Sequence, residues 1–322
     1  MVSKNSLFGP IDPAVDAGYS DPPPRKGFFT DTSVCIGCKA CEVACKEWNL
    51  LPSTEEFDLL GMSFDNTGAL GSNSWRHVAF IEQPMPTATA GAPKVDLGMP
   101  SLGPPGSPLG PPIEAEVEEG DTAHGAPLPN FRWLMSSDVC KHCTHAACLD
   151  VCPTGALFRT EFGTVVVQDD VCNGCGYCVA ACPYGVIERR REPEGAQNVG
   201  IAQKCTLCYD RLGAGMQPAC AQACPTDSIQ FGDVEELRER AEQRRATLQE
   251  AGVSEARLYG HDPNDGVGGT GAFFLLLDEP EVYGLPPDPV VTTRDLPRMF
   301  NRAGIAGLGL MAAVVAAFVR KR

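Results

Sequence analysis

Cysteine is the residue type whose number and spacing in this chain suggest chemistry. The 322 residues contain 16 cysteines, which form four groups of four: Cys35, Cys38, Cys41, Cys45; Cys140, Cys143, Cys148, Cys152; Cys172, Cys175, Cys178, Cys182; Cys205, Cys208, Cys220, Cys224. Disulfides fit poorly, because thiols at i, i+3 and i+6 crowd onto one short loop. All-cysteine zinc sites usually use two C-x2-C pairs about a dozen or more residues apart. The grouping therefore favours a polynuclear metal site.

The third group has the full spacing of an iron–sulfur ligand run. Cys172 to Pro183 matches C-x2-C-x2-C-x3-C-P, the run found in bacterial ferredoxins. Three closely spaced thiolates bind three corners of a [4Fe–4S] cubane, and a distant thiolate binds the fourth. The 140 and 205 groups lengthen the second gap, and Lys46 replaces the proline in the first group. We expect four [4Fe–4S] clusters as cofactors.

The ligands of each cluster are expected to come from two groups. In two-cluster ferredoxins the fourth cysteine of a run binds the neighbouring cluster. The two inner groups are close in sequence, so we pair them with each other and pair the two outer groups. The expected ligand sets are Cys35, Cys38, Cys41, Cys224; Cys140, Cys143, Cys148, Cys182; Cys172, Cys175, Cys178, Cys152; and Cys205, Cys208, Cys220, Cys45.

Four lysines adjoin ligand cysteines, and they are either solvated or tune the clusters by their charge; they are Lys39, Lys46, Lys141 and Lys204. His142 and His145 flank Cys143, but sixteen thiolates already fill sixteen sites. The run "GVGGTG" at 266–271 precedes a predicted strand instead of following one, so we interpret it as a flexible loop and not a dinucleotide site. No nucleophile–base arrangement stands out. We expect a non-catalytic electron carrier.

The net charge of -15 makes nucleic acid a poor partner.

Alternation and turn residues predict strands at 75–83, 131–135, 227–231 and 272–278, and a hairpin over 156–167 turning at Gly163. Asp233 and Glu236 suggest a capping box for a helix over about 234–251 that stops at Gly252. The fold class is α+β and loop-rich, and cluster binding is expected to be coupled to folding.

We expect two nested ferredoxin-like modules. The predicted segments are an N-terminal arm (1–26), an outer module with two clusters (27–83 plus 199–292), a Pro/Gly-rich insertion (84–129), an inner module with two clusters (130–198) and a membrane anchor (293–322). The insertion lacks periodicity and has the composition of a flexible surface segment, or of an arm lying on a partner.

The C-terminal segment Ala303–Val319 has 17 residues without a charge, short for a membrane span. Small residues at 309, 313 and 317 would let a partner's helix pack closely. The alternative is a buried C-terminal helix. Basic residues lie on both sides, and those nearest the apolar run favour a cytoplasmic C-terminus with an extracytoplasmic cluster domain; a cytoplasmic location stays open. The N-terminus has no apolar signal region, so export would depend on a partner.

The cysteine runs "CIGCKACEVACKEWN", "CKHCTHAACLDVCPTGAL", "CNGCGYCVAACPYGVI" and "KCTLCYDRL" resemble those of the iron–sulfur (beta) subunit of membrane-bound molybdenum or tungsten formate dehydrogenases. The resemblance covers roughly residues 27–83 and 130–232. It implies the crossed ligand sets, a molybdopterin catalytic (alpha) subunit and, often, a membrane cytochrome b (gamma) subunit that passes electrons to quinone. All four clusters resemble [4Fe–4S] because no tryptophan replaces a cysteine. The insertion departs from the family pattern.

Three alternatives stay open at this point. The same relay could serve another molybdopterin oxidoreductase or a membrane hydrogenase, and the co-purifying chains would identify it. A free-standing polyferredoxin would purify without detergent or a large partner. A zinc scaffold would contain zinc and no acid-labile sulfide.

Overall fold

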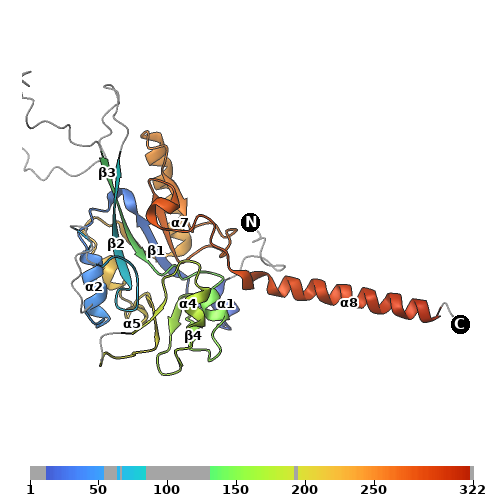
Figure 1. The fold of residues 1–322 in the computed structure, drawn as a ribbon. Coiled ribbons are helices and arrows are strands. Elements are labelled where there is room, and N and C mark those ends of the chain that lie inside the picture. The colour runs from blue at the N-terminus through green and yellow to red at the C-terminus, as the bar shows by residue number, and fades with distance from the viewer. Residues whose placement is uncertain (1–11, 54–63, 66, 85–130, 192–194, 320–322) are drawn as a thin grey trace, which may run out of the picture. The chain divides into compact units, whose positions relative to one another are not determined.

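The computed structural model describes residues 12–53, 64–65, 67–84, 131–191 and 195–319. The chain divides into two compact units, residues 1–81 with 135–322, and residues 82–134. Almost all of the predicted insertion, 84–129, lies outside the described residues. Helices and strands are mixed, as predicted (Figure 1).

A four-stranded sheet with the order β8-β1-β10-β9 forms the largest regular element. Its central strand β1 pairs antiparallel with β8 and parallel with β10, and β10 pairs antiparallel with β9. The bounds are β1 Lys26–Asp31, β8 Ile229–Asp233, β9 Arg257–Tyr259 and β10 Ala272–Leu276. The sheet therefore joins the beginning of the chain to residues more than two hundred positions later.

The two faces of this sheet have different partners. On one face, Phe29, Phe273 and Leu275 pack against helix α7, Val234–Glu250, through Leu237 and Ala241. The rings of Phe29 and Phe273 stack with their centroids 5.5 Å apart. Because side chains alternate along a strand, the neighbouring residues point to the opposite face.

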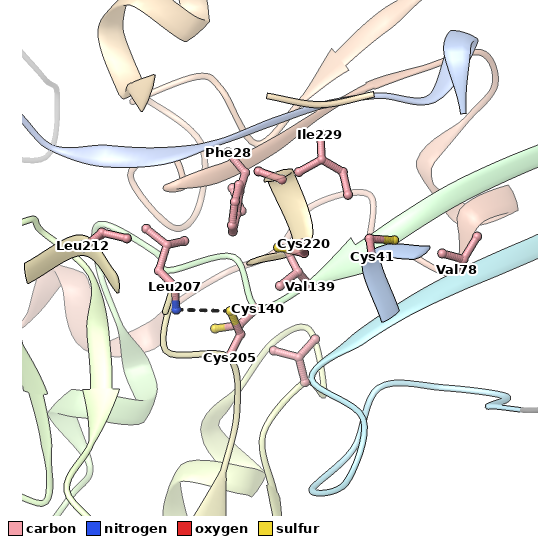
Figure 2. Packing of buried hydrophobic residues seen from close by; sticks show 13 residues of the cluster. Phe28, Cys41, Val78, Val139, Cys140, Cys205, Leu207, Leu212, Cys220 and Ile229 are labelled. Atoms are coloured by element: carbon pink, nitrogen blue, oxygen red, sulfur yellow. Dashed lines mark hydrogen bonds between the residues drawn. The ribbon is translucent and has the colours of Figure 1, made fainter. Parts of the chain in front are cut away.

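The opposite face contributes Phe28 and Ala272 to a core that contains ligand cysteines. Figure 2 shows Phe28 in this core together with Cys41, Cys140, Cys205 and Cys220. The backbone N–H of Leu207 donates a hydrogen bond to the Cys205 sulfur at 3.3 Å (Figure 2). The sheet thus separates an ordinary apolar core from a sulfur-lined one.

Short elements carry the remaining chain. Three two-stranded sheets pair β2 with β3, β4 with β5, and β6 with β7; these are β2 Arg76–Pro84, β3 Phe131–Val139, β4 Leu157–Arg159, β5 Val165–Val167, β6 Glu188–Arg189 and β7 Ala202–Gln203. The short helices are α1 Pro13–Asp16, α2 Ala40–Trp48, α3 Ala147–Asp150, α4 Tyr177–Ala181, α5 Tyr209–Gly213 and α6 Ala219–Gln222, with 3-10 turns η1 Thr32–Val34, η2 Pro280–Tyr283 and η3 Thr292–Asp295.

The predicted capping box was wrong, and the predicted strand at 131–135 was confirmed but too short. Asp233 does not cap α7 with its side chain; it is the last residue of β8, lies opposite Lys26 of β1 and forms an ion pair with that lysine. Strand β3 continues past Met135 to Val139, and Ser137 in this extension accepts hydrogen bonds from Arg76 of β2. The predicted stop at Gly252 is confirmed, with φ +94° directly after the C-cap residue Ala251.

Helix α8, Leu296–Val319, follows η3 at the C-terminal end of the described chain (Figure 1). Its segment Met299–Val319 has 21 residues and is long and apolar enough to cross a membrane. At 1.5 Å per residue this segment is roughly 31 Å long, close to the thickness of a bilayer's hydrocarbon core. The side chains of this segment are exposed in the isolated chain, which does not fit the alternative of a buried C-terminal helix.

Candidate metal centres

All sixteen cysteines are free thiols, with no disulfide among them. They lie in tight loops and on the short helices that follow these loops. In the first loop, Gly37 has φ +65° and Lys39, which precedes α2, has φ +58°. A Cβ on Gly37 would lie only 2.6 Å from the Met135 sulfur and 2.7 Å from the Phe80 ring. The glycine therefore allows this tight loop to pack closely against Met135 and Phe80.

The first hollow is lined by Cys35, Cys38, Cys41 and Cys224, which are the members of one expected ligand set. Its empty volume is about 290 Å³, and Val78 and Ile229 are among its apolar walls. Burial raises the pKa of the Cys35 thiol, and the negative charge of Cys224 raises it further. The structure thus brings a cysteine near the end of the cluster region to the first cysteine loop.

A second hollow, of about 380 Å³, is lined by Cys140, Cys143, Cys148 and Cys182. Burial raises the pKa of the Cys143 thiol well above its ordinary value, and the other three sulfurs add to this rise. These four residues are another expected ligand set.

The third expected set is seen in the electrostatics of Cys178. The pKa of this thiol is raised to about 11. Burial is the main cause, and the charges of Cys172, Cys175 and Cys152 raise the pKa further. Cys152 itself is more exposed, and although its partial burial acts to raise its pKa, hydrogen bonds from the backbone of Leu157 and neighbouring residues lower it. The four sulfurs are therefore within electrostatic reach of one another.

The fourth expected set surrounds Cys45 in the same way. Burial raises the pKa of the Cys45 thiol well above its ordinary value, and the next contributions come from Cys220 and Cys205, with Cys208 also raising it. All four cysteines of this set are buried. Each predicted combination of three cysteines from one run with a fourth from another is thus brought together in space.

The four sets are also neighbours of one another. Burial is the main cause of the raised pKa values of Cys148, Cys205 and Cys41, and in each case a sulfur of another set raises the pKa further. That sulfur belongs to Cys178 for Cys148, to Cys140 for Cys205 and to Cys220 for Cys41. These three sulfur pairs connect the sets in the order of their members Cys178, Cys140, Cys205 and Cys41.

The donor chemistry of these sets fits iron–sulfur clusters. Thiolate is the ligand that holds such clusters, and a thiol must lose its proton to bind iron. In the described part of the chain, no group of three or more His, Cys, Asp or Glu side chains is arranged to hold a single metal ion. A cubane does not require that arrangement, because each of its thiolates binds a different iron. When bound, such a cluster accepts and releases one electron.

Of the four lysines that adjoin ligand cysteines, Lys39, Lys141 and Lys204 have other partners. Lys39 forms ion pairs with Asp65 at 3.0 Å and Glu42 at 3.3 Å. The Lys141 ammonium forms an ion pair with Asp138 and lies 4.9 Å from the centre of the Phe274 ring.

Lys204 lines the 380 Å³ hollow, and its ammonium donates to the backbone oxygens of Val165 and Cys205. Lys46 is half-buried and lines a hollow with Cys45. His142 is buried in the wall of the 380 Å³ hollow and accepts a hydrogen bond from the Val165 N–H at Nδ1, 3.2 Å away.

The glycine-rich run at 266–271 is a structured loop, in contrast to the flexible loop we predicted. Its backbone accepts hydrogen bonds from Thr144 and His145 at 3.0 and 2.8 Å, and Gly271 donates to the Lys141 oxygen at 2.9 Å. A Cβ on Gly268 would lie 2.5 Å from the His145 ring. The loop therefore supports the cysteine loop that contains Cys143.

Arg76 is the functional candidate that the sequence analysis missed. It begins β2, is 2% exposed, and lies near sulfurs of two different sets. Burial acts to lower its pKa, but the negative charges of Cys220, Cys41, Cys205 and Cys45 outweigh burial and raise it. The signal in the sequence was an arginine within a predicted strand, where a positive charge needs a partner if the side chain is buried.

Comparisons with known proteins assign the family. A 4Fe-4S dicluster domain profile matches residues 131–234, and a 4Fe-4S binding domain profile matches residues 32–48. The formate dehydrogenase iron–sulfur subunit of Haemophilus influenzae is 37% identical over 289 residues, covering 87% of this chain and 76% of that protein. This chain belongs to the family of formate dehydrogenase iron–sulfur subunits. The predicted resemblance is confirmed.

Other relatives place this formate dehydrogenase-type subunit in a wider group. The iron–sulfur subunit of the nitrate-inducible formate dehydrogenase of Escherichia coli is 35% identical, with 82% of this chain and 73% of that protein covered. A subunit of the anaerobic dimethyl sulfoxide reductase of Escherichia coli is 32% identical, with 66% of this chain and 76% of that protein covered. The two matched profile regions contain all sixteen cysteines.

Proposed function

We propose that this chain relays electrons one at a time through four [4Fe–4S] clusters. The electrons come from a molybdopterin subunit that oxidises formate, and they pass to a membrane cytochrome b and then to quinone. The observation that carries this proposal is the assembly of sixteen cysteines into four neighbouring all-sulfur sets in a member of the formate dehydrogenase subunit family. The chain itself contributes no catalytic residue to formate oxidation in this proposal. Its role is to hold the carriers in sequence.

The proposed ligand sets are those expected from the cysteine spacing. Crossed sharing of the fourth cysteine creates two nested modules, an inner one over 130–198 and an outer one over 27–83 with 199–292. The sulfur neighbours Cys35 with Cys224 and Cys45 with Cys220 support the outer module.

The sulfur neighbours between sets support a linear relay. The proposed order begins with the cluster at Cys41, continues through those at Cys205 and Cys140, and finishes with the cluster at Cys178. Each cluster in this order receives an electron from one neighbour and passes it to the next. A linear order requires an accessible cluster at each end and enclosed clusters between them.

The exposure of the cysteines agrees with such an order. Cys38 belongs to the first set and Cys175 to the last, and both are exposed, whereas neither middle set has an exposed cysteine. Exposed apolar residues accompany both ends, with Ile36 and Val43 near Cys38 and Tyr177 near Cys175. We assign the two ends as entry and exit points covered by partner subunits.

The membrane is proposed to lie at the Cys175 end. Thr293 of η3, directly before α8, donates a hydrogen bond to Asp150 of α3, the helix that carries Cys148. The sets of the inner module, which contain Cys140 and Cys178, therefore lie next to the start of the anchor helix. We assign the opposite end, at Cys38, to the catalytic subunit. The basic residues nearest the apolar run support a cytoplasmic C-terminus and an extracytoplasmic cluster domain.

The decisive experiment is anaerobic purification in mild detergent, followed by iron and sulfide analysis and mass spectrometry of the co-purifying chains. The expected result is about sixteen irons per chain, by ligand count, together with a large pterin-containing subunit and a cytochrome b. About eight irons after full reconstitution would contradict the four-cluster proposal. A sulfoxide reductase as the large subunit would instead support the alternative suggested by the 32% identical relative.

A further inference from the structure

The Arg76 guanidinium is buried at the boundary between two cysteine sets, and two of its three nitrogens have no hydrogen-bond partner. Its Nη1 donates hydrogen bonds to Ser137, to Oγ at 2.9 Å and to the backbone oxygen at 3.3 Å. Its guanidinium carbon lies 4.9 Å from the centre of the Phe28 ring. These contacts fix the plane of the group, while Nε and Nη2 have no partner.

Such a charge requires negative charge nearby. An isolated buried cation is strongly unfavourable, and buried arginines are normally paired with a carboxylate or another anion. Among the described residues, no carboxylate forms an ion pair with Arg76. Sulfurs of two sets lie within electrostatic reach, Cys41 in one set and Cys45, Cys205 and Cys220 in the other.

Ser137 links the arginine to one of these sulfurs. Its hydroxyl lies 3.2 Å from the Cys41 sulfur while it accepts the hydrogen bond from Arg76. By comparison, Lys141 already has Asp138 as a counter-ion, and the Lys204 ammonium is directed to carbonyl oxygens. The free donors of Arg76 thus remain available to an anionic group held between the two sets.

We propose that Arg76 is a positioning residue for two adjacent clusters, with its Nε–H and Nη2–H donating to their sulfur atoms and its charge raising both reduction potentials. This inference rests on the proposed function, namely that these sets hold clusters. Each cluster gains one electron from its neighbour and releases one to the next, and its reduced form carries one more negative charge. A fixed cation stabilises that reduced form in both clusters, which keeps them poised for transfer between each other.

The test uses the intact, detergent-solubilised complex with Arg76→Gln and Arg76→Lys. Midpoint potentials are measured by redox titration followed by electron paramagnetic resonance, with iron content measured in parallel. In Arg76→Gln we expect two of the four potentials to fall by about 59 mV, a tenfold change in a one-electron equilibrium. In Arg76→Lys the same two should fall by less, because the charge remains and the fixed donors are lost.

Arg190→Gln is the matched control. Arg190 is also buried, but its guanidinium donates to neutral groups, among them Asn73, Ser72 and Gln203. This variant should lose stability and leave all four potentials unchanged.

Unchanged potentials in both Arg76 variants, or an equal shift of all four, would overturn the inference. If Arg76→Gln does not assemble, Arg76→Lys decides the question. Unchanged potentials in Arg76→Lys would show that the Nε and Nη2 donors of Arg76 do not act on the clusters. Failure of the proposed function is separately visible, since the wild-type complex would then lack the iron of four clusters.

Discussion

The hydroxyl oxygen of Ser137 lies 3.2 Å from the sulfur of Cys41. These residues come from β3 and α2, and the same hydroxyl accepts a hydrogen bond from Arg76 of β2. One serine therefore couples a proposed iron ligand to the buried cation beside it.

Ser137→Ala tests the hydrogen bond to the ligand. Once Cys41 is a thiolate, the serine hydroxyl donates to it and stabilises the added charge of the reduced cluster. A hydrogen bond to a charged group contributes about 1.5–3 kcal/mol. We expect the potential of the cluster held by Cys41 to fall, with iron content unchanged. Ser136→Ala, at the neighbouring position on β3, is the control, and an equal effect there would contradict the assignment.

Crossed ligation is tested by Cys224→Ser and Cys45→Ser. Loss of one cluster should leave about twelve of about sixteen irons by ligand count and expose the three orphaned thiols to alkylation. In Cys224→Ser, peptide mass spectrometry should find new alkylation at Cys35, Cys38 and Cys41. In Cys45→Ser it should find the label at Cys205, Cys208 and Cys220. The reverse pattern would mean that each run ligates its own cluster.

Phe29→Ala tests whether the α7 face is independent of the clusters. Phe29 is fully buried between the sheet and α7, so its truncation should lower the free energy of unfolding by about 3–5 kcal/mol. The cluster potentials should stay as in the wild type, because the ring points away from the sulfur-lined face. Val199→Ala, at an exposed position, should change stability by no more than about 0.5 kcal/mol.

Glu42 predicts a pH dependence of stability. Burial acts to raise its pKa, but the His77 ring, whose Nδ1 lies 3.4 Å from the carboxylate, the hydrogen bond from the Val78 N–H and the Lys39 charge outweigh burial and lower the pKa below 4.5. A lowered folded-state pKa gives stability that is present above 4.5 and lost as the pH falls through the folded-state pKa. The difference in unfolding free energy between wild type and Glu42→Gln should therefore be greatest near neutral pH and shrink below 4.5.

The pH dependence of the Glu42→Gln effect on unfolding free energy needs a control on the same helix. Glu47→Gln, exposed on α2, should show no such pH-dependent difference. Denaturant titrations at matched pH values, performed anaerobically, provide the measurement. A Glu42→Gln difference that grows toward low pH would contradict the predicted sign.

Leu310→Arg tests the anchor. Leu310 lies near the middle of Met299–Val319, where an arginine disfavours membrane insertion by about 2.5–3.5 kcal/mol. We expect part of the chain to move to the soluble fraction on carbonate extraction, in cells that lack the partner subunits. Met299→Arg, at the N-terminal end of the apolar segment, should have little effect because its side chain can reach the interface. Equal release by both variants would argue against a spanning helix.

Cysteine spacing indicated iron–sulfur binding because few other structures share this short, repeated ligand pattern, whereas the crossed ligand sets stay a prediction. The strands at 75–83 and 272–278 were also predictable from alternating or continuous apolar residues. The sheet order was not, since pairing of Phe28 with Ala272 depends on contacts across most of the chain. The capping box failed for the same reason, because a cross-strand partner, Lys26, engages Asp233.

Arg76 could not be assigned from sequence because its role depends on what surrounds it in space. Its neighbours Ser137 and Cys220 are distant in sequence, and a single arginine carries no spacing pattern. The lysines adjoining cysteines were easier to notice, yet Lys141 is largely neutralised by Asp138. Adjacency in sequence was therefore a weaker guide to cluster electrostatics than burial without a counter-ion.

With the proposed ligand sets, the meeting of Cys35 with Cys224 imposes an order on biosynthesis. A ribosome makes Cys35 early, but the fourth thiol of that set emerges 189 residues later (224 minus 35). Both inner sets are complete once Cys182 has been made. Iron loading during translation would thus fill the proposed membrane-side half of the relay first and the half that faces the catalytic subunit last. A product truncated after Cys182 would retain two carriers and lack the proposed route to the catalytic subunit.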